Sequence, residues 1–207
     1  IQVKFCIVIN NMQNQTFIFF GIQGSGKGTQ IELLKEYLKQ KNNKESFYIY
    51  PGGEYRKQIE SNSNMGKLIN DSVTRGELQP DFLTTSLVTN LLTVSSLDNK
   101  HLFFDGYPRS IIQSESFEEM VHFFKFSNIK IIYIELSKEE AIKRNMFRGR
   151  HDDTEEGLNK RFGWYFDNVI PAMNYFKGKD GYEFLIINGE QSIEDVHRDI
   201  IKSLELI

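Results

Sequence analysis

The sequence predicts an α/β domain built on a doubly wound, five-stranded parallel sheet between two layers of helices. Five apolar segments run without polar alternation, as strands covered on both faces do. Longer segments of helical pattern separate them, as the crossovers between parallel strands require. The expected strands are residues 16–20, 47–50, 101–105, 130–134 and 183–187.

Length and composition favour one soluble domain. The 207 residues suit a single domain, and 40% hydrophobic with 13% aromatic residues can fill its core, which excludes a disordered chain. The net charge of −3, without a dominant basic block, disfavours a nucleic-acid partner. Every apolar run is far shorter than the ~20 residues that span a membrane. The single cysteine, Cys6, excludes a disulfide framework. The cysteine usage suits a reducing, cytoplasmic compartment. Separately, we expect a monomer.

Residues 1–11 precede Met12 and the first expected strand. Their apolar run follows only Lys4 and lacks a small-residue cleavage site, so it does not resemble a secretory signal. We expect residues 1–11 to be a leader or an extra edge segment, and residues 12–207 to form the domain.

The first strand leads directly into residues 21–29, which read GIQGSGKGT, and a helical pattern follows over residues 30–38. This order fits the G-x-x-x-x-G-K phosphate loop, in which glycines let backbone N–H groups face phosphate oxygens beside a positive helix N-terminus. Lys27 adds a mobile cation. The alternative is a glycine-rich turn with an incidental lysine, and the strand and helix around it disfavour that reading. We therefore expect a nucleoside triphosphate to bind, but motors, GTPases and small-molecule kinases share this loop.

The third strand ends in Asp105-Gly106-Tyr107-Pro108-Arg109. Asp105, at the strand end, is placed to hold magnesium-bound water. Gly106 permits close backbone approach, and Pro108 stiffens the turn that presents Arg109. Alone, this segment is better interpreted as a turn with an exposed arginine.

Four of the eight arginines fall within eighteen residues: Arg144, Arg148, Arg150 and Arg161. Arg144 and Arg148 share a helix face and repel each other unless an anion lies between them. Guanidinium groups bind phosphate in a bidentate manner, whereas lysine acts as a point charge. The alternative is a solvated basic helix end, neutralised by Asp152, Asp153, Glu155 and Glu156.

Capping and periodicity complete the expected elements. Ser137-x-x-Glu140 and Asp153-x-x-Glu156 are typical of capping boxes at helix starts. The last helix carries an apolar stripe that would dock on the sheet, formed by Ile193, Val196, Ile200, Ile201 and Leu204.

Taken together, residues 16–206 resemble the adenylate kinase family of nucleoside monophosphate kinases. Four motifs carry the resemblance, in family order: GIQGSGKGTQ at 21–30, Gly52-x-x-x-Arg56, Asp105-Gly106-Tyr107-Pro108-Arg109-x-x-x-Gln113, and Arg148-x-Arg150-x-Asp152-Asp153 before Lys160-Arg161. The third motif is the most specific. The resemblance implies a P-loop fold with a helical monophosphate-binding insert over about 52–80 and a short lid over about 148–153.

The resemblance also implies a role for each site residue. The ATP phosphates would meet Gly24, Ser25, Gly26, Lys27, Gly28, Thr29 and Arg148, and the ATP adenine would meet Arg144 and the backbone of Gln191. Arg56 and Arg109 would hold the acceptor phosphate, and Gly52 and Gly106 would belong to the same monophosphate site. The backbone around Glu77, Leu78 and Gln79 and the side chain of Gln113 would meet the acceptor base. Arg150 and Arg161 would bridge both phosphates. The catalytic residues would be Lys27, Arg109, Arg148, Arg150 and Arg161.

The expected reaction is reversible, Mg²⁺-dependent transfer of the γ-phosphoryl group from ATP to a monophosphate, with Asp105 holding Mg²⁺ through water. The short lid lacks zinc ligands, so no structural zinc is expected. Gln113 favours AMP as the acceptor. Pro51 stands where the family usually has a hydroxyl residue, and Pro51-Gly52-Gly53 is similar to thymidylate kinases, so kinases for UMP, CMP or dTMP remain alternatives.

Two other classes of function stay open. A nucleotide-sensing P-loop module would bind without turnover but would not require Arg56, Arg109 and the lid arginines together. A nucleic-acid-dependent NTPase is disfavoured by the acidic charge balance. Assaying ADP production with each monophosphate would separate these possibilities.

Overall fold

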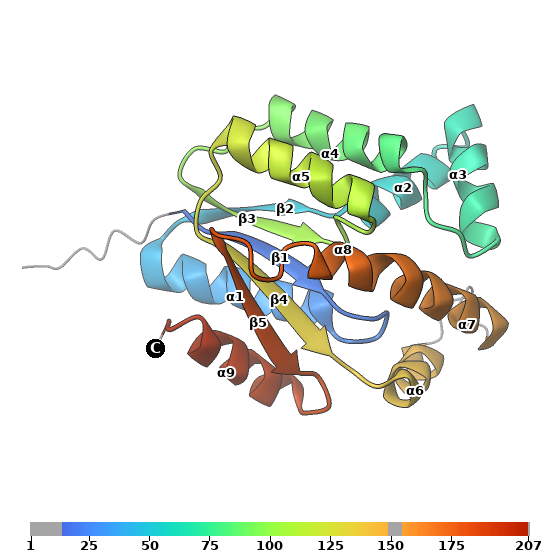
Figure 1. Cartoon of the computed structure of the whole chain (residues 1–207). Coiled ribbons are helices and arrows are strands. Elements are labelled where there is room, and N and C mark those ends of the chain that lie inside the picture. Colours follow the sequence, from blue (N-terminus) through green and yellow to red (C-terminus); the bar gives the residue numbers. More distant parts are fainter. Residues whose placement is uncertain (1–13, 149–154, 207) are drawn as a thin grey trace, which may run out of the picture.

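The computed structural model describes residues 14–148 and 155–206. Within them, five parallel strands form one sheet in the order β2-β3-β1-β4-β5 (Figure 1). The strands are β1 (Thr16–Phe20), β2 (Glu45–Ile49), β3 (Lys100–Asp105), β4 (Ile129–Glu135) and β5 (Tyr182–Asn188). The predicted fold class is confirmed. The strand order reverses beside β1, and ligands bind such sheets at the carboxyl side of this switch point.

Helices cover both faces of the sheet. One face carries α1 (Lys27–Asn42) and α9 (Ile193–Ser203); the other carries α4 (Asp81–Val94), α5 (Ile111–Phe124) and α8 (Ile170–Asn174) (Figure 1). The remaining helices are α2 (Pro51–Glu60), α3 (Asn64–Thr74), α6 (Lys138–Arg148), α7 (Glu155–Trp164) and the π-helical turn η1 (Tyr165–Val169).

Two cores explain why the predicted strands lack polar alternation. In β1, Phe17 and Phe19 pack among residues of α1 and α9, whereas Ile18 and Phe20 pack among residues of α4 and α5. All of β1 is buried. Burying each such side chain contributes about 1.5–3 kcal/mol, so a strand apolar on both faces is stable only between two helical layers.

The carboxyl ends of the strands meet at one edge of the sheet, where α2 and α3 lie on one side and α6 and α7 on the other (Figure 1). A third small core fixes α6 and α7 against the loop after β1. It consists of Ile22, Ala141, Leu158, Phe162 and Tyr165. A cleft at this edge is lined by residues of the loop after β1, of α2 and α3, and of α6 and α7.

Two helix-start predictions have different outcomes. The Glu140 backbone N–H lies 3.4 Å from Ser137 Oγ, so Ser137 caps α6 as predicted. The reciprocal half of the box is absent because the Glu140 carboxylate instead accepts from Arg144. The predicted cap at Asp153 lies outside the described residues.

The predicted leader over residues 1–11 also lies outside the described residues, as do residues 149–153 of the predicted lid, including Arg150. The helix α6 ends at Arg148, whose side chain is not part of the described structure. Across residues 14–148 and 155–206, no helix combines the length and the apolar character that a membrane crossing requires.

Buried His101 makes stability depend on pH. Its Nδ1 accepts from the Gln15 backbone N–H at 3.2 Å, and its Nε2 lies 2.9 Å from the Asn42 amide. Burial, with a smaller contribution from the Lys44 charge, lowers the pKa of His101 to about 4. Below pH 6.5 the unfolded chain binds a proton that the folded chain binds only near pH 4. The free energy of unfolding should therefore fall by about 3 kcal/mol between pH 7 and pH 4 on account of His101.

Denaturant titrations at pH 7, 5.5 and 4 measure this fall. The variant His101→Gln should lose less stability over this range than the parent chain, whereas His122→Gln, at an exposed position, should match the parent. An equal loss in the parent chain and in His101→Gln would contradict the assignment.

Candidate active site

The loop between β1 and α1 forms the floor of the site. Gly24 has φ 93°, and a Cβ there would lie 2.7 Å from Asn145 Nδ2, so only glycine fits the close approach. Lys27 Nζ donates to the carbonyls of Gly21 at 2.6 Å and Ile22 at 3.2 Å. Because α1 begins at Lys27, its first N–H groups face this loop. The loop therefore combines a helix N-terminus with a cation, as phosphate binding requires.

Asn145 joins this loop to α6. Its side chain is fully buried, and Nδ2 donates to the Gln23 carbonyl at 2.8 Å and to the Ala141 carbonyl at 2.7 Å. Buried polar groups are costly unless they are hydrogen-bonded, so this amide fixes the loop in one position. Sequence reasoning missed Asn145, since only the packing of α6 shows that this residue faces the loop.

Asp105 ends β3 and is almost completely buried, with 7% of its surface exposed. Its Oδ2 accepts from the Tyr48 hydroxyl at 2.7 Å. Burial and the Asp105 charge raise the pKa of Tyr48 far above its usual value near 10, so this phenol stays protonated and donates. Tyr48 was not predicted as a site residue because its strand was interpreted only as core.

A single aligned carboxylate suits a hydrated Mg²⁺ better than a cage of protein ligands. Among the described residues, no cluster of three or more His, Cys, Asp or Glu side chains is arranged to hold a metal. Asp105 lines the same cleft as Lys27 and Thr29. The Asp105 carboxylate and the Thr29 hydroxyl are oxygen ligands of the kind that Mg²⁺ prefers, so this part of the cleft fits a hydrated Mg²⁺ ion.

The turn after β3 presents Arg109. Gly106 has φ 71°, and a Cβ there would collide with the Arg109 guanidinium, so the arginine lies across the glycine. The Arg109 backbone N–H donates to Gln113 Oε1 at 2.8 Å. These two contacts fix the turn and the direction of the side chain.

Arg56 extends from α2 into the cleft. Its Nη1 and Nη2 donate to the Tyr50 hydroxyl at 2.9 and 2.6 Å, and its guanidinium carbon lies 5.3 Å from the centre of the Tyr50 ring. Within residues 14–148 and 155–206, no carboxylate forms an ion pair with Arg56 or Arg109. Guanidinium groups that lack a carboxylate partner are available to bind an anion.

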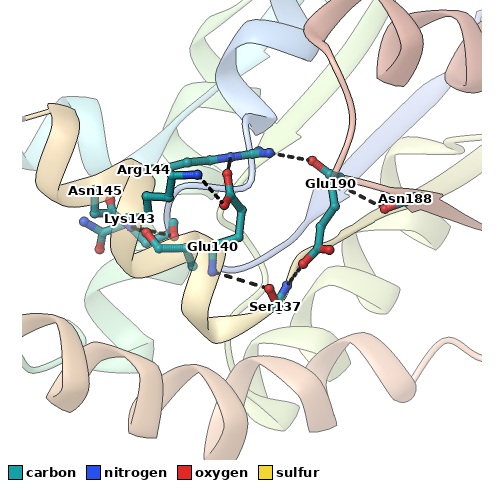
Figure 2. Close-up of polar contacts among 10 residues, drawn as sticks. Ser137, Glu140, Lys143, Arg144, Asn145, Asn188 and Glu190 are labelled. Carbon is teal, nitrogen blue, oxygen red and sulfur yellow. Dashed lines mark hydrogen bonds and ion pairs between the residues drawn. The ribbon is translucent and has the colours of Figure 1, made fainter.

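The Arg144 side chain extends from α6 to the turn after β5 (Figure 2). Its Nε donates to Glu140 Oε1 at 2.8 Å, and its Nη2 donates to the Gly189 carbonyl at 3.0 Å. The hydrogen bond from Arg144 is the main cause that lowers the pKa of Glu140. On the same turn, Glu190 Oε1 accepts from the Ser137 backbone N–H at 3.2 Å (Figure 2). The Arg144 guanidinium group is therefore held at two points, by Glu140 and by the Gly189 carbonyl.

Arg161 extends from α7 toward the loop, where its Nη1 lies 3.4 Å from Gln23 Oε1. The phosphate loop thus contacts both α6 and α7 through residue Gln23. Neither contact could be predicted from spacing, since α7 is distant in sequence from the loop.

These residues line one cleft of about 1240 Å³. A pocket for a single drug-sized ligand has roughly 300–1,000 Å³, so this cleft has room for a larger ligand or for two. The predicted residues that line it are Gly24, Gly26, Lys27, Gly28, Thr29, Gly52, Arg56, Glu77, Leu78, Gln79, Asp105, Gly106, Arg109, Gln113, Arg144 and Arg161.

Two predicted residues do not belong to the described lining of the cleft. Ser25, within the loop, is buried, and its Oγ lies 3.5 Å from Lys27 Nζ. The side chain of Gln191 turns back, and its Nε2 donates to the Asn188 carbonyl and to Asp199. Arg148 and Arg150 cannot be compared, because their side chains lie outside the described structure.

Positive charge dominates the described lining. The cations are Lys27, Arg56, Arg109, Arg144 and Arg161, and the carboxylates are Glu60, Glu77 and Asp105. Five cations against three carboxylates favour an anionic ligand, and these cations come from opposite walls of the cleft. The arrangement can neutralise phosphate groups entering from both sides.

The chain is similar to known proteins over most of its length. The family model described as adenylate kinase matches residues 19–181. An adenylate kinase of Prochlorococcus marinus is 33% identical over 183 residues, 88% of this chain and 94% of the relative. An adenylate kinase of Bacteroides fragilis is 32% identical over 194 residues, 92% of this chain and 98% of the relative. An adenylate kinase of Azobacteroides pseudotrichonymphae is 30% identical over 191 residues, 90% of this chain and 95% of the relative. The chain belongs to the adenylate kinase family.

Proposed function

We propose that this chain is an adenylate kinase, which transfers the γ-phosphoryl group of ATP reversibly to AMP in a Mg²⁺-dependent reaction. The observation that carries the proposal is the convergence of cations from the phosphate loop, α2, the turn after β3, α6 and α7 on one cleft. A hydrolase that activates water needs one anion site, whereas a kinase for monophosphates needs two that meet end to end.

On the donor side, the loop over residues 24–29 would surround the ATP phosphates. Lys27 would exchange its two carbonyl contacts for phosphate oxygens, which are stronger acceptors for an ammonium group. Arg144, fixed by Glu140 and Gly189, would present its flat face to the adenine ring. Gln191 lies in the same turn after β5 and would meet the adenine through its backbone.

On the acceptor side, Arg56 and Arg109 would hold the AMP phosphate. Arg56 is held by the Tyr50 hydroxyl, which a phosphate dianion can displace. Gly52 and Gly106 would allow close approach of the backbone. The segment Glu77-Leu78-Gln79 and the Gln113 side chain would meet the base.

Catalysis would consist of positioning and charge stabilisation, because a phosphate oxygen of the acceptor is already a good nucleophile. Mg²⁺, when bound beside Asp105, would neutralise charge on the transferring phosphates. Arg161, joined to the loop through Gln23, would lie between the two phosphate chains and stabilise the charge on the transferred group. The same task is proposed for Arg148 and Arg150.

We propose that residues 52–80, which contain α2 and α3, form the monophosphate-binding insert, and that residues 148–153 form a short lid. Residues 12–207 would make up one kinase domain, with residues 1–11 as a leader or extra edge segment. The enzyme would be a cytoplasmic monomer that closes on its substrates and so limits ATP hydrolysis.

An assay of ADP production from ATP with each monophosphate tests the proposal. AMP should give the highest kcat/KM, and chelation of Mg²⁺ should abolish turnover. Preference for UMP, CMP or dTMP would contradict the acceptor assignment. Nucleotide binding without ADP from any monophosphate would instead indicate a sensing module.

The variant Arg161→Ala tests the arginine between the two phosphate chains. We expect kcat to fall by about 10³-fold or more, because a transition-state arginine contributes roughly 10³–10⁵ in rate. Steady-state kinetics measures the fall in kcat, and thermal unfolding shows whether the variant remains folded. Arg198→Ala is the matched control, since Arg198 on α9 pairs with Asp195 at the surface. Near-normal turnover in Arg161→Ala would contradict the role.

The variant Asn145→Leu tests the anchoring of the phosphate loop. Leucine has a similar size but cannot donate to the Gln23 carbonyl, so we expect the KM for ATP to rise about tenfold. The loss of the two hydrogen bonds should also cost about 1–3 kcal/mol of stability. The KM for AMP should change little, and an equal rise in both KM values would show a general structural effect instead.

A further inference from the structure

The Gln113 amide has a partner at each end. Its Oε1 accepts from the Arg109 backbone N–H at 2.8 Å, and its Nε2 donates to Asp81 Oδ1 at 2.8 Å. Gln113 is buried, with 2% of its surface exposed, and lines the cleft. Asp81 is not among the described residues that line the cleft. We propose that Asp81 is a positioning residue that sets the base selectivity of the acceptor site.

The two partners allow only one orientation of the amide. The Asp81 carboxylate can only accept, and a backbone N–H can only donate. A flipped Gln113 would place its oxygen against the Asp81 carboxylate and its NH₂ group against the Arg109 N–H. Both hydrogen bonds would become repulsive contacts in a buried site, where unpaired polar groups are most costly. The orientation therefore follows from the chemistry of the partners.

The fold holds Asp81 in place. Asp81 is the first residue of α4 and follows Pro80, so the start of that helix fixes the backbone conformation of Asp81. The Ser110 hydroxyl donates to Asp81 Oδ1 at 2.7 Å and accepts from the Gln113 backbone N–H at 3.1 Å. Asp81, Ser110 and Gln113 thus form a closed set of contacts between α4 and α5.

The locked amide still has one N–H and one oxygen lone pair for a ligand, because each end has used only one of two hydrogen bonds. A base complementary to this pair offers a ring-nitrogen acceptor beside an exocyclic N–H donor. Adenine and cytosine have this edge. Hypoxanthine, guanine, uracil and thymine have the reverse, a ring N–H beside a carbonyl oxygen, and would meet like groups.

This inference rests on the proposed function, in which Gln113 meets the acceptor base. It adds that Asp81, at the back of the site, makes the site prefer amino bases over oxo bases. The size of the site, and not Asp81, would then separate adenine from cytosine.

The test compares AMP with IMP, which share ribose, phosphate and ring size and differ in the 6-amino or 6-oxo group. The parent enzyme should favour AMP in kcat/KM by roughly 100-fold or more, because a polar site rejects a mismatched partner strongly. In Asp81→Asn this ratio should fall by roughly tenfold, since an amide can donate to a flipped Gln113. Asp98→Asn, an exposed position with the same charge change, should keep the parent ratio.

The outcomes are distinct. A parent enzyme that uses AMP and IMP equally overturns the inference, and this measurement needs no variant. An equal fall for both substrates in Asp81→Asn, with the ratio kept, also overturns it and leaves Asp81 a purely structural role. Absence of ADP from every monophosphate contradicts the proposed function itself, and the inference falls with it.

Discussion

Repulsion among like charges is the constraint on which the site depends. Five cations line one cleft, and at close range such groups repel one another unless anions separate them. Lys27 is held by loop carbonyls and Arg56 by the Tyr50 hydroxyl, both partners that phosphate can replace, whereas Glu140 and the Gly189 carbonyl fix Arg144 in place. The two phosphate chains proposed as ligands would relieve this repulsion.

The sheet makes this concentration of charge possible. The carboxyl ends of all five described strands meet at one edge, so segments far apart in sequence present their side chains there (Figure 1). Two cores, one on each face, supply the stability that the charged edge does not contribute. Asn145 and Tyr48 then fix the phosphate loop and Asp105 from behind. Rigid neighbours of this kind hold catalytic groups in position before substrate arrives.

Much of the fold and of the site could be predicted from the sequence, because the residues that indicate each feature are close together in the chain. The apolar runs of the strands, the glycines around Lys27 and the turn before Arg109 each lie within a few residues of one another. These contacts of Asn145, Tyr48 and Asp81 could not be predicted, since each joins residues 32 or more positions apart through a side chain with an ordinary local environment. The burial of Ser25 and the contacts of Gln191 with Asn188 and Asp199 are local, but they depend on side-chain conformations that the motifs do not specify.

Titration calorimetry with a bisubstrate analogue, two adenosines joined by a chain of five phosphates, measures whether the five cations form one site for two nucleotides. We expect one analogue to bind per chain, with an affinity that falls when either ATP or AMP is added as a competitor. It also predicts that raised salt weakens binding, because several cations contact one polyanion. Competition by ATP alone, with AMP without effect, would show that the cations do not form one site for two nucleotides and would contradict the account.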